Sequence, residues 1–302
     1  MVGRPLEVDG LTKHFGGTVA LDGLSFTVRP GVVTGFLGPN GSGKTTTLRC
    51  LLGLVTPTRG TATIGGQRYR DLADPVRTVG ASLEASSFHP GRTARAHLQV
   101  VALAAGVPSE RVDALVQQVG LTEAASRRVG GFSLGMRQRL ALAQALIGDP
   151  EVLLLDEPAN GLDPAGIAWL RGFLRALAAE GRTVLVSSHV LSEVEQTVDD
   201  VVVITRGRLV HQGALAELEA GPGSARVRVR TPEPQALRRV VDRALEVAVE
   251  QLPDGALRVV GASAAEVGHA AHVAGVELHE LAAEPSDLEQ LFLAMTREGG
   301  AA

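Results

Sequence analysis

Short apolar runs bounded by polar residues mark the middle of the chain. Residues 152–155 (Val-Leu-Leu-Leu) and 183–187 (Thr-Val-Leu-Val-Ser) are runs of this kind, which are typical of parallel strands buried on both faces. A helical pattern over about residues 165–179 lies between them and predicts a βαβ unit. Residues 31–37 predict another buried strand, and residues 46–54 predict a helix directly after it. The pattern therefore predicts an α/β fold with a parallel-sheet core.

Two other regions have different patterns. The first 70 residues predict strands separated by turns, and segments 61–64 and 67–70 flank Gly65-Gly66, which predicts a β-hairpin. From about residue 92 to 148, alanine-rich segments with regularly spaced leucines are interrupted by glycine and proline. Such a pattern predicts a small helical subdomain.

A break in composition at residues 219–224 (Glu-Ala-Gly-Pro-Gly-Ser) predicts a linker. We expect a first domain at residues 1–220, with the helical subdomain at about 86–150, and a second domain at residues 221–302. Strands and helices follow one another in the second domain in the order βαββαβ, which predicts a small α+β domain of the ferredoxin-like kind.

A last helix is predicted after that domain's final strand, where Ser286 and Glu289 form a capping box. One face of this helix is apolar, with Leu288, Leu291, Phe292 and Met295. The apolar face either packs on the domain's own sheet or forms a contact in a dimer.

The composition narrows the possible classes of protein. The chain has 302 residues, enough for two domains. Its net charge is −4 and it has no basic stripe with interleaved aromatic residues, so nucleic acid is not an expected partner. Cys50 is the only cysteine, which excludes an internal disulfide and fits a reducing cytoplasm; we expect it to pack inertly in a helix. No apolar run reaches the length of about 18 residues that a membrane span needs, so a membrane role requires a partner chain.

A glycine-rich loop follows the strand predicted at 31–37. The residues expected to hold a nucleotide are Gly38, Pro39, Asn40, Gly41, Ser42, Gly43, Lys44, Thr45 and, in the helix that follows, Thr46. Glycines let backbone N–H groups surround a phosphate, and the helix N-terminus adds partial positive charge. Lys44 is one of two lysines beside 27 arginines, which fits the need for a compact ammonium between the β- and γ-phosphates. The hydroxyl of Thr45 is expected to bind Mg²⁺. A glycine-rich turn without a ligand is the alternative.

Two carboxylates end the strand predicted at 152–155. Asp156 is expected to hold Mg²⁺ through water, and Glu157 to polarise the water that attacks the γ-phosphorus. An isolated Asp-Glu pair would be a solvated loop, but these residues lie at the strand end where ligands gather in open α/β sheets. Together with the glycine-rich loop they predict nucleotide hydrolysis.

At this point the chain resembles the ATP-binding subunit of an ABC transporter. Residues 132–139 (Phe-Ser-Leu-Gly-Met-Arg-Gln-Arg) look like a variant of that family's signature sequence, with Leu134 in place of the usual second glycine. The resemblance implies that Ser133 and Gly135 contact the γ-phosphate held by a second copy of the chain. Leu134 then places a side chain where the backbone usually approaches unobstructed. Ser133 also suits a helix N-cap, a structural role that is compatible with the functional one.

The resemblance implies roles for further residues. Phe15 is at the position of the aromatic residue that stacks on adenine, with a core phenylalanine as the alternative. Asp163 lies in the segment that resembles the loop touching the partner subunit. His189 matches the histidine that binds the γ-phosphate and holds the attacking water. Glu84 stands where the family has a glutamine, and we expect it to bind Mg²⁺ or its water and to link the nucleotide to the partner. The adjoining residues 85–97 are the expected permease contact, with a solvated arginine face as the alternative.

The resemblance covers residues 6 to about 213, and it implies a P-loop NTPase of the ABC type with an antiparallel β subdomain, a parallel-sheet core and a helical subdomain. The region after residue 221 resembles the accessory domain of daunorubicin-resistance and bacitracin exporters. The family works as a head-to-tail dimer that encloses two ATP molecules and Mg²⁺. We therefore expect an ATP-hydrolysing exporter subunit for drugs, antibiotics or peptides. It would be held at the cytoplasmic face of the membrane by integral-membrane permease subunits.

Two other functions remain as alternatives. One is an ABC ATPase that acts on DNA or ribosomes, but the sequence has no long coiled coil, zinc-ligand cysteines or second ATPase domain. The other is a regulatory nucleotide-binding protein without turnover, which Glu157 and His189 argue against.

Overall fold

The computed structural model describes residues 3–83, 88–190, 195–219 and 225–284. The chain divides into two compact units, the first extending to Gly213 and the second beginning at Ala214. Each unit has a hydrophobic core of its own. Most of the predicted linker lies outside the described residues.

The first unit contains a succession of strands and helices. Its strands are β1 (Leu6–Phe15), β2 (Thr18–Val28), β3 (Val33–Leu37), β4 (Arg59–Ile64), β5 (Val79–Ser82), β6 (Val152–Asp156), β7 (Thr183–Ser188), β8 (Asp200–Thr205) and β9 (Arg208–Ala214). Its helices are α1 (Lys44–Leu51), α2 (Pro75–Thr78), α3 (Ala94–Ala104), α4 (Glu110–Gln118), α5 (Leu134–Ala145) and α6 (Pro164–Ala179). A short helix, α8 (Leu215–Glu219), belongs to the second unit.

A six-stranded sheet forms the centre of the first unit, in the order β5-β6-β7-β3-β8-β9. Strand β3 pairs in parallel with β7 and β8, and β6 pairs in parallel with β5 and β7. Helix α6 contacts β3 and β7, and α1 contacts β6. The predicted parallel strands and βαβ unit are confirmed. The carboxyl ends of such strands are where ligands bind in open α/β sheets.

A second, antiparallel sheet has the order β2-β1-β4. The hairpin predicted around Gly65-Gly66 is wrong beyond a single bridge between Ile64 and Gln67. Strand β4 pairs with β1 on one edge, and the residues after Gln67 do not continue as a strand along the other. Pairing with β1 buries Ile64 in the core. The segment after the turn, Gln-Arg-Tyr-Arg, offers one large apolar side chain and continues into a 3₁₀ turn at Tyr69–Asp71.

Helix α1 packs between the two sheets. Leu48 and Leu51 are fully buried and join Phe36 of β3 and Ile64 of β4 in one core. Cys50 lies in this core, and burial raises the pKa of its thiol. A protonated, buried thiol is unreactive, so the expectation that Cys50 packs in this helix is confirmed.

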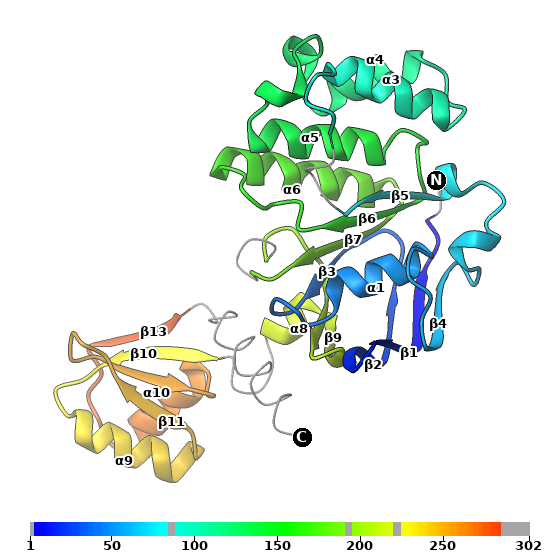
Figure 1. Cartoon of the computed structure of the whole chain (residues 1–302). Helices are drawn as coiled ribbons and strands as arrows, with labels where there is room; N and C mark the ends of the chain where they lie inside the picture. Colours follow the sequence, from blue (N-terminus) through cyan, green and yellow to red (C-terminus); the bar gives the residue numbers. More distant parts are fainter. Residues whose placement is uncertain (1–2, 84–87, 191–194, 220–224, 285–302) are drawn as a thin grey trace. The chain divides into compact units, whose positions relative to one another are not determined.

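The predicted helical subdomain consists of α3, α4 and α5, which contact one another (Figure 1). Each helix contributes a fully buried leucine, Leu98, Leu115 or Leu140. Ser133 caps α5, since its hydroxyl accepts a hydrogen bond of 3.2 Å from the backbone N–H of Met136. Such a cap contributes about 1 kcal/mol to helix stability and fixes where α5 begins.

The second unit is a ferredoxin-like α+β domain, as predicted. Its main elements are β10 (Arg226–Arg230), α9 (Pro234–Leu245), β11 (Ala248–Gln251), β12 (Leu257–Val260), α10 (Ala264–Val273) and β13 (Glu280–Glu284). The antiparallel sheet has the order β11-β12-β10-β13, which is the order of a split βαβ fold. The last helix predicted by the sequence lies outside the described residues.

A buried arginine ties the start of β7 to the turn before β6. Arg182 is 7% exposed and donates hydrogen bonds of 2.9 Å to Pro150 O, 2.9 Å to Asp149 Oδ1 and 3.0 Å to Glu180 Oε2. Burial raises the pKa of Asp149, but Arg182 and Arg111 outweigh it and hold that pKa below its usual value. This stabilisation is present above the ordinary aspartate pKa of about 4 and is lost as the pH falls through the lower, folded-state pKa.

We expect Arg182→Met to lower the free energy of unfolding by about 1–3 kcal/mol, because it leaves the buried carbonyl group of Pro150 without this donor and removes a cation from the half-exposed carboxylates of Asp149 and Glu180. Urea denaturation followed by circular dichroism at neutral pH measures this loss. Exposed Arg68 supplies the matched control, since Arg68→Met should change stability by less than about 0.5 kcal/mol. Equal effects of the two substitutions would contradict the assignment.

Candidate active site

The glycine-rich loop connects β3 to α1 in a conformation that requires glycine. Gly43, at the N-cap of α1, has φ of +108°, and a Cβ there would lie 2.6 Å from Leu21 Cδ2 and 2.8 Å from Ala20 O. At Gly38 a Cβ would lie 2.5 Å from Ile204 O. Surrounding backbone and core atoms therefore leave no space for a Cβ at these two positions. The glycines allow the tight turn that brings backbone N–H groups toward a ligand.

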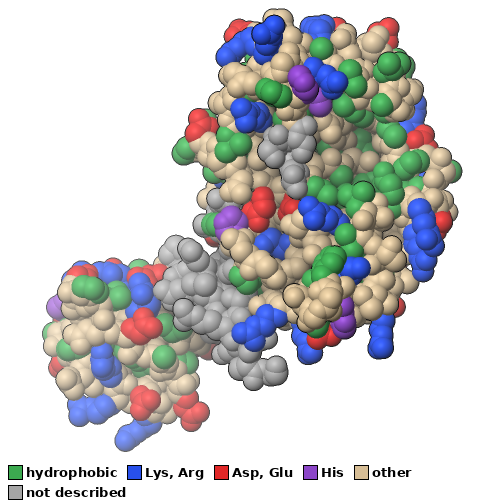
Figure 2. Space-filling model, viewed as in Figure 1, with side chains coloured by type: hydrophobic (Ala, Val, Ile, Leu, Met, Phe, Trp, Pro, Cys, Tyr) green, Lys and Arg blue, Asp and Glu red, His purple; other side chains and the backbone are tan. Residues whose placement is uncertain are grey.

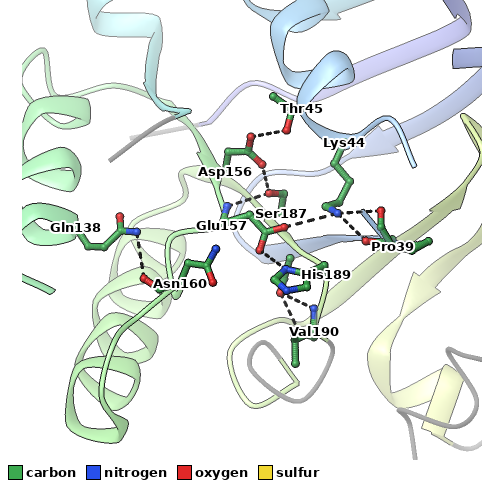
Figure 3. A network of polar contacts seen from close by, with 12 residues as sticks. Pro39, Lys44, Thr45, Gln138, Asp156, Glu157, Asn160, Ser187, His189 and Val190 are labelled. Carbon is green, nitrogen blue, oxygen red and sulfur yellow. Dashed lines mark hydrogen bonds and ion pairs between the residues drawn. The ribbon is translucent and has the colours of Figure 1, made fainter. Parts of the chain in front are cut away.

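Lys44 begins α1 and points back into the loop. Its Nζ donates a hydrogen bond of 2.6 Å to Gly38 O and lies 3.6 Å from Glu157 Oε1 (Figure 3). The side chain is 6% exposed. Burial lowers the pKa of Lys44, and the nearby carboxylates of Glu157 and Asp156 oppose that shift. The loop thus holds one compact cation against its own carbonyl groups.

Asp156 accepts hydrogen bonds from hydroxyl groups on two different elements. Thr45 Oγ1 donates a hydrogen bond of 2.7 Å to Asp156 Oδ2, and Ser187 Oγ donates a short one to Asp156 Oδ1. Ser187 is adjacent because β6 and β7 pair in parallel with Asp156 and Ser187 in register. A carboxylate beside a threonine hydroxyl is the kind of oxygen set that Mg²⁺ prefers.

Glu157 lies between Lys44 and His189. Its Oε2 is 2.8 Å from His189 Nδ1, and Lys44 approaches its other oxygen. Glu157 has φ of +50°, an uncommon conformation for a residue with a side chain. The backbone N–H of Glu157 donates a hydrogen bond of 3.0 Å to Ser187 Oγ, which helps to hold it there. Strained positions of this kind cluster at functional sites.

These side chains open into one pocket of about 510 Å³. Its lining is Ala20, Asn40, Gly41, Ser42, Gly43, Lys44, Thr45, Thr46, Glu157, Asn160 and His189. Asp156 adjoins it through Thr45, and Gly38 and Pro39 accept the hydrogen bonds of Lys44. The structure therefore gathers the predicted loop, the carboxylates and the histidine at the carboxyl ends of β3, β6 and β7.

Other predicted residues do not line this pocket. Ser133 and Asp163 cap α5 and α6, and Gly135 lies in the first turn of α5. Phe15 ends β1 and is 50% exposed, so the alternative of a core phenylalanine is wrong. Glu84 lies outside the described residues.

Two residues of the site were missed by the sequence reasoning. Ser187 binds Asp156 and the Glu157 backbone, and Asn160 lines the pocket. A serine at the end of a strand was visible, but its role depends on the register of β6 with β7, and register is not read from the sequence of one strand. Asn160 follows Glu157 closely and carries no pattern of its own.

The surface adds two observations. On the face seen in Figure 2, Lys and Arg side chains of the first unit are interspersed with Asp and Glu and do not form a continuous stripe. No helix of the described ranges is both long and apolar enough to cross a membrane.

The fold and the pocket define the class of protein as a P-loop nucleoside triphosphatase. Comparison with known families refines this class. The ABC transporter family matches residues 21–160. A domain of unknown function (DUF8746) matches residues 225–289.

Individual relatives support the family. The uncharacterized ABC transporter ATP-binding protein YhcH of Bacillus subtilis is 45% identical over 208 residues, covering 68% of each chain. The bacitracin transport ATP-binding protein BcrA of Bacillus licheniformis is 42% identical over 210 residues, which is 68% of this chain and 69% of that one. A solved ATP-binding subunit of an ABC transporter has a TM-score of 0.64 and 29% identity, covering 71% of this chain and 92% of its own. The chain belongs to the ATP-binding proteins of ABC transporters and is an ATPase.

Proposed function

We propose that the chain is the ATP-hydrolysing motor subunit of an ABC exporter. It works as a head-to-tail dimer on a separate membrane permease. The observation that carries this proposal is the convergence of Lys44, Thr45, Asp156, Glu157 and His189 on one pocket. ATP hydrolysis requires a phosphate cradle, a metal site and a positioned base, and this pocket holds a candidate for each.

The glycine-rich loop holds the β- and γ-phosphates of ATP. Lys44 supplies the ammonium. The hydroxyl of Ser42, which is buried and has no hydrogen-bond partner among the described residues, supplies a further donor. Thr45 and Asp156 fit Mg²⁺ because their oxygens already meet at 2.7 Å, and Glu84 would bind the ion or its water. When bound, the ion neutralises negative charge that develops on the phosphates.

Glu157 accepts a proton from the attacking water. His189 positions the Glu157 carboxylate and that water. An ionised carboxylate only accepts hydrogen bonds, so His189 carries its proton on Nδ1 where it meets Glu157. The contact with His189 and the constrained backbone of Glu157 fix the carboxylate before ATP arrives, which lowers the cost of reaching the reactive geometry.

A second copy of the chain completes the site. Ser133, Gly135 and Asp163 do not line the pocket of their own chain, yet Ser133 begins a helix whose N-terminus suits an anion. In a twofold head-to-tail dimer these residues face the partner's ATP. Phe15, half-exposed at the end of β1, stacks on adenine. ATP then becomes part of the interface, and its hydrolysis lets the pair reopen.

The relatives suggest the kind of transport. The bacitracin transport protein is 42% identical, so we infer that this chain serves an exporter of a drug, antibiotic or peptide. It binds permease subunits at the cytoplasmic face of the membrane. We assign the ATPase domain to residues 1–220 and the accessory domain to residues 221–302, with residues 85–97 as the permease contact.

Co-purification tests this function. Pull-down of the Glu157→Gln chain from detergent-solubilised membranes of its own cells, with ATP present, should recover an integral-membrane protein with several spans. That protein should stay bound when ATP is replaced by ADP, because the proposed cycle opens the dimer of ATP-binding chains and not the contact with the permease. Recovery of ribosomes or DNA would contradict the proposal and favour an ABC ATPase that acts on nucleic acid.

A further inference from the structure

The side chain of Leu134 lies on a glycine of another loop. Leu134 is the first residue of α5, directly after Ser133. Its Cδ2 is 2.0 Å, and its Cγ 3.1 Å, from the place that a Cβ at Gly161 would occupy. The contact is reciprocal, because a Cβ at Gly135 would lie 3.3 Å from Leu162 Cδ2. Each leucine therefore packs on the glycine of the opposite dipeptide, and we call this pair of contacts the Leu-Gly interlock.

The interlock explains how a leucine fits at position 134. The resemblance to the family places a glycine there and led us to expect a side chain that obstructs the approach of a nucleotide. Leu134 is 49% exposed, and its other half covers Gly161 of the same chain. Gly161 has φ of +71° and no side chain, so it provides both the turn and the space. Any larger residue at position 161 would displace Leu134.

The loop under Leu134 leads directly to the pocket. The backbone N–H of Asn160 donates a hydrogen bond of 3.1 Å to Glu157 O, and Gln138 Nε2, on α5, donates one of 3.5 Å to Asn160 O (Figure 3). A short run of packed residues thus connects Ser133, proposed to act on the partner's ATP, with Glu157, proposed to act on the chain's own ATP.

We propose that the Leu-Gly interlock positions the beginning of α5 against the loop that follows Glu157. Leu134 is a positioning residue in this arrangement, and the inference rests on the proposed dimeric function. Ser133 directly precedes Leu134 at the start of α5, so the packing of Leu134 on Gly161 sets where Ser133 stands when it meets the partner's ATP.

The interlock is separable from the folding of the two helices. Arg139 of α5 lies over the ring of Trp169 of α6 at 3.8 Å, and its Nη1 donates a hydrogen bond of 2.9 Å to Val119 O. This contact holds α5 beside α6 one to two turns away from Leu134. Substitutions at the interlock should therefore displace the start of α5 without releasing the helix.

The test is a pair of compensating substitutions in the Glu157→Gln background. Gly161→Ala should raise the ATP concentration needed for half-maximal dimerisation by about tenfold or more, because overpacking displaces Leu134. Leu134→Ala/Gly161→Ala should restore it to within about threefold of Leu134→Ala alone, since Leu134 Cβ lies 3.8 Å from the added methyl group. The affinity of each variant for ADP, a readout of the chain's own loop, should change by less than about twofold.

Gly106 provides the matched control. Its φ is +65° and nothing lies within 4 Å of a Cβ placed there, so Gly106→Ala adds the backbone strain without the collision. If Gly106→Ala and Gly161→Ala shift dimerisation equally, or if Leu134→Ala gives no rescue, the interlock is wrong. If Gly161→Ala does not fold, restored folding in the double variant supports the collision, and a double variant that also fails to fold overturns it.

A Glu157→Gln parent that does not dimerise with ATP overturns the proposed dimer and the interlock with it. If the Glu157→Gln parent dimerises with ATP and the added Gly161→Ala substitution leaves that dimerisation unchanged, the interlock alone is overturned.

Discussion

Glu157→Gln should hydrolyse ATP about 10²–10⁴-fold more slowly than the wild-type chain, which is the usual contribution of a general base. An amide has the shape of the carboxylate but does not accept the proton of the attacking water. Binding of ATP should be retained or improved, because the substitution removes a negative charge 3.6 Å from Lys44. Release of inorganic phosphate measures turnover, and size-exclusion chromatography with ATP and Mg²⁺ should show a stable dimer.

Glu110 offers a matched control for this prediction. It lies in the first turn of α4 and is exposed, so Glu110→Gln should leave both hydrolysis and dimerisation within about twofold of wild type. Hydrolysis at the wild-type rate in Glu157→Gln would overturn the assignment of the base. Slow hydrolysis without an ATP-dependent dimer would keep the base and contradict the head-to-tail arrangement.

The parts of the site that lie close in sequence were predictable. The loop from Gly38 to Thr45 is a contiguous motif, and in the structure its glycines form a tight turn with Lys44 pointing back into it. Asp156 and Glu157 end a strand of the parallel sheet, where ligands gather for reasons of topology alone. The order of strands and helices in the second unit was likewise predictable. The spacing of apolar residues distinguishes helices from strands, and turn residues mark where each element ends.

The features that depend on a distant partner were not predictable. Gly65-Gly66 is a local turn signal, yet β4 pairs with β1, and no residue near the turn specifies that partner. Ser187 gained its role from strand register. Leu134 looked like an obstruction because the glycine that receives it, Gly161, lies on a different element. In each case the missing information was a contact between elements.

The charges around Lys44 suggest how binding and catalysis are coupled. Lys44 and His189 both approach Glu157, so a phosphate attracted to Lys44 competes with that carboxylate. We expect bound ATP to draw Lys44 toward its phosphates, while the contact of 2.8 Å between His189 Nδ1 and Glu157 Oε2 keeps the carboxylate in place.

Lys44→Ala should lower the affinity for ATP by about a hundredfold or more and abolish measurable turnover. A hydrogen bond to a charged group contributes about 1.5–3 kcal/mol. Removal of the ammonium also leaves Asp156 and Glu157 facing the phosphates without a compensating charge.

Lys44→Arg is the sharper variant, because it keeps the charge in a chain that otherwise uses arginine. The Lys44 side chain is 6% exposed and its Nζ donates a hydrogen bond of 2.6 Å to Gly38 O. The longer, planar guanidinium cannot take the same place without displacing the loop, so Lys44→Arg should bind ATP about as weakly as Lys44→Ala. Isothermal titration with ATP measures both, with Arg68→Ala as the surface control. Wild-type affinity in Lys44→Arg would mean that charge alone, and not the compact shape of the ammonium, keeps a lysine at this position.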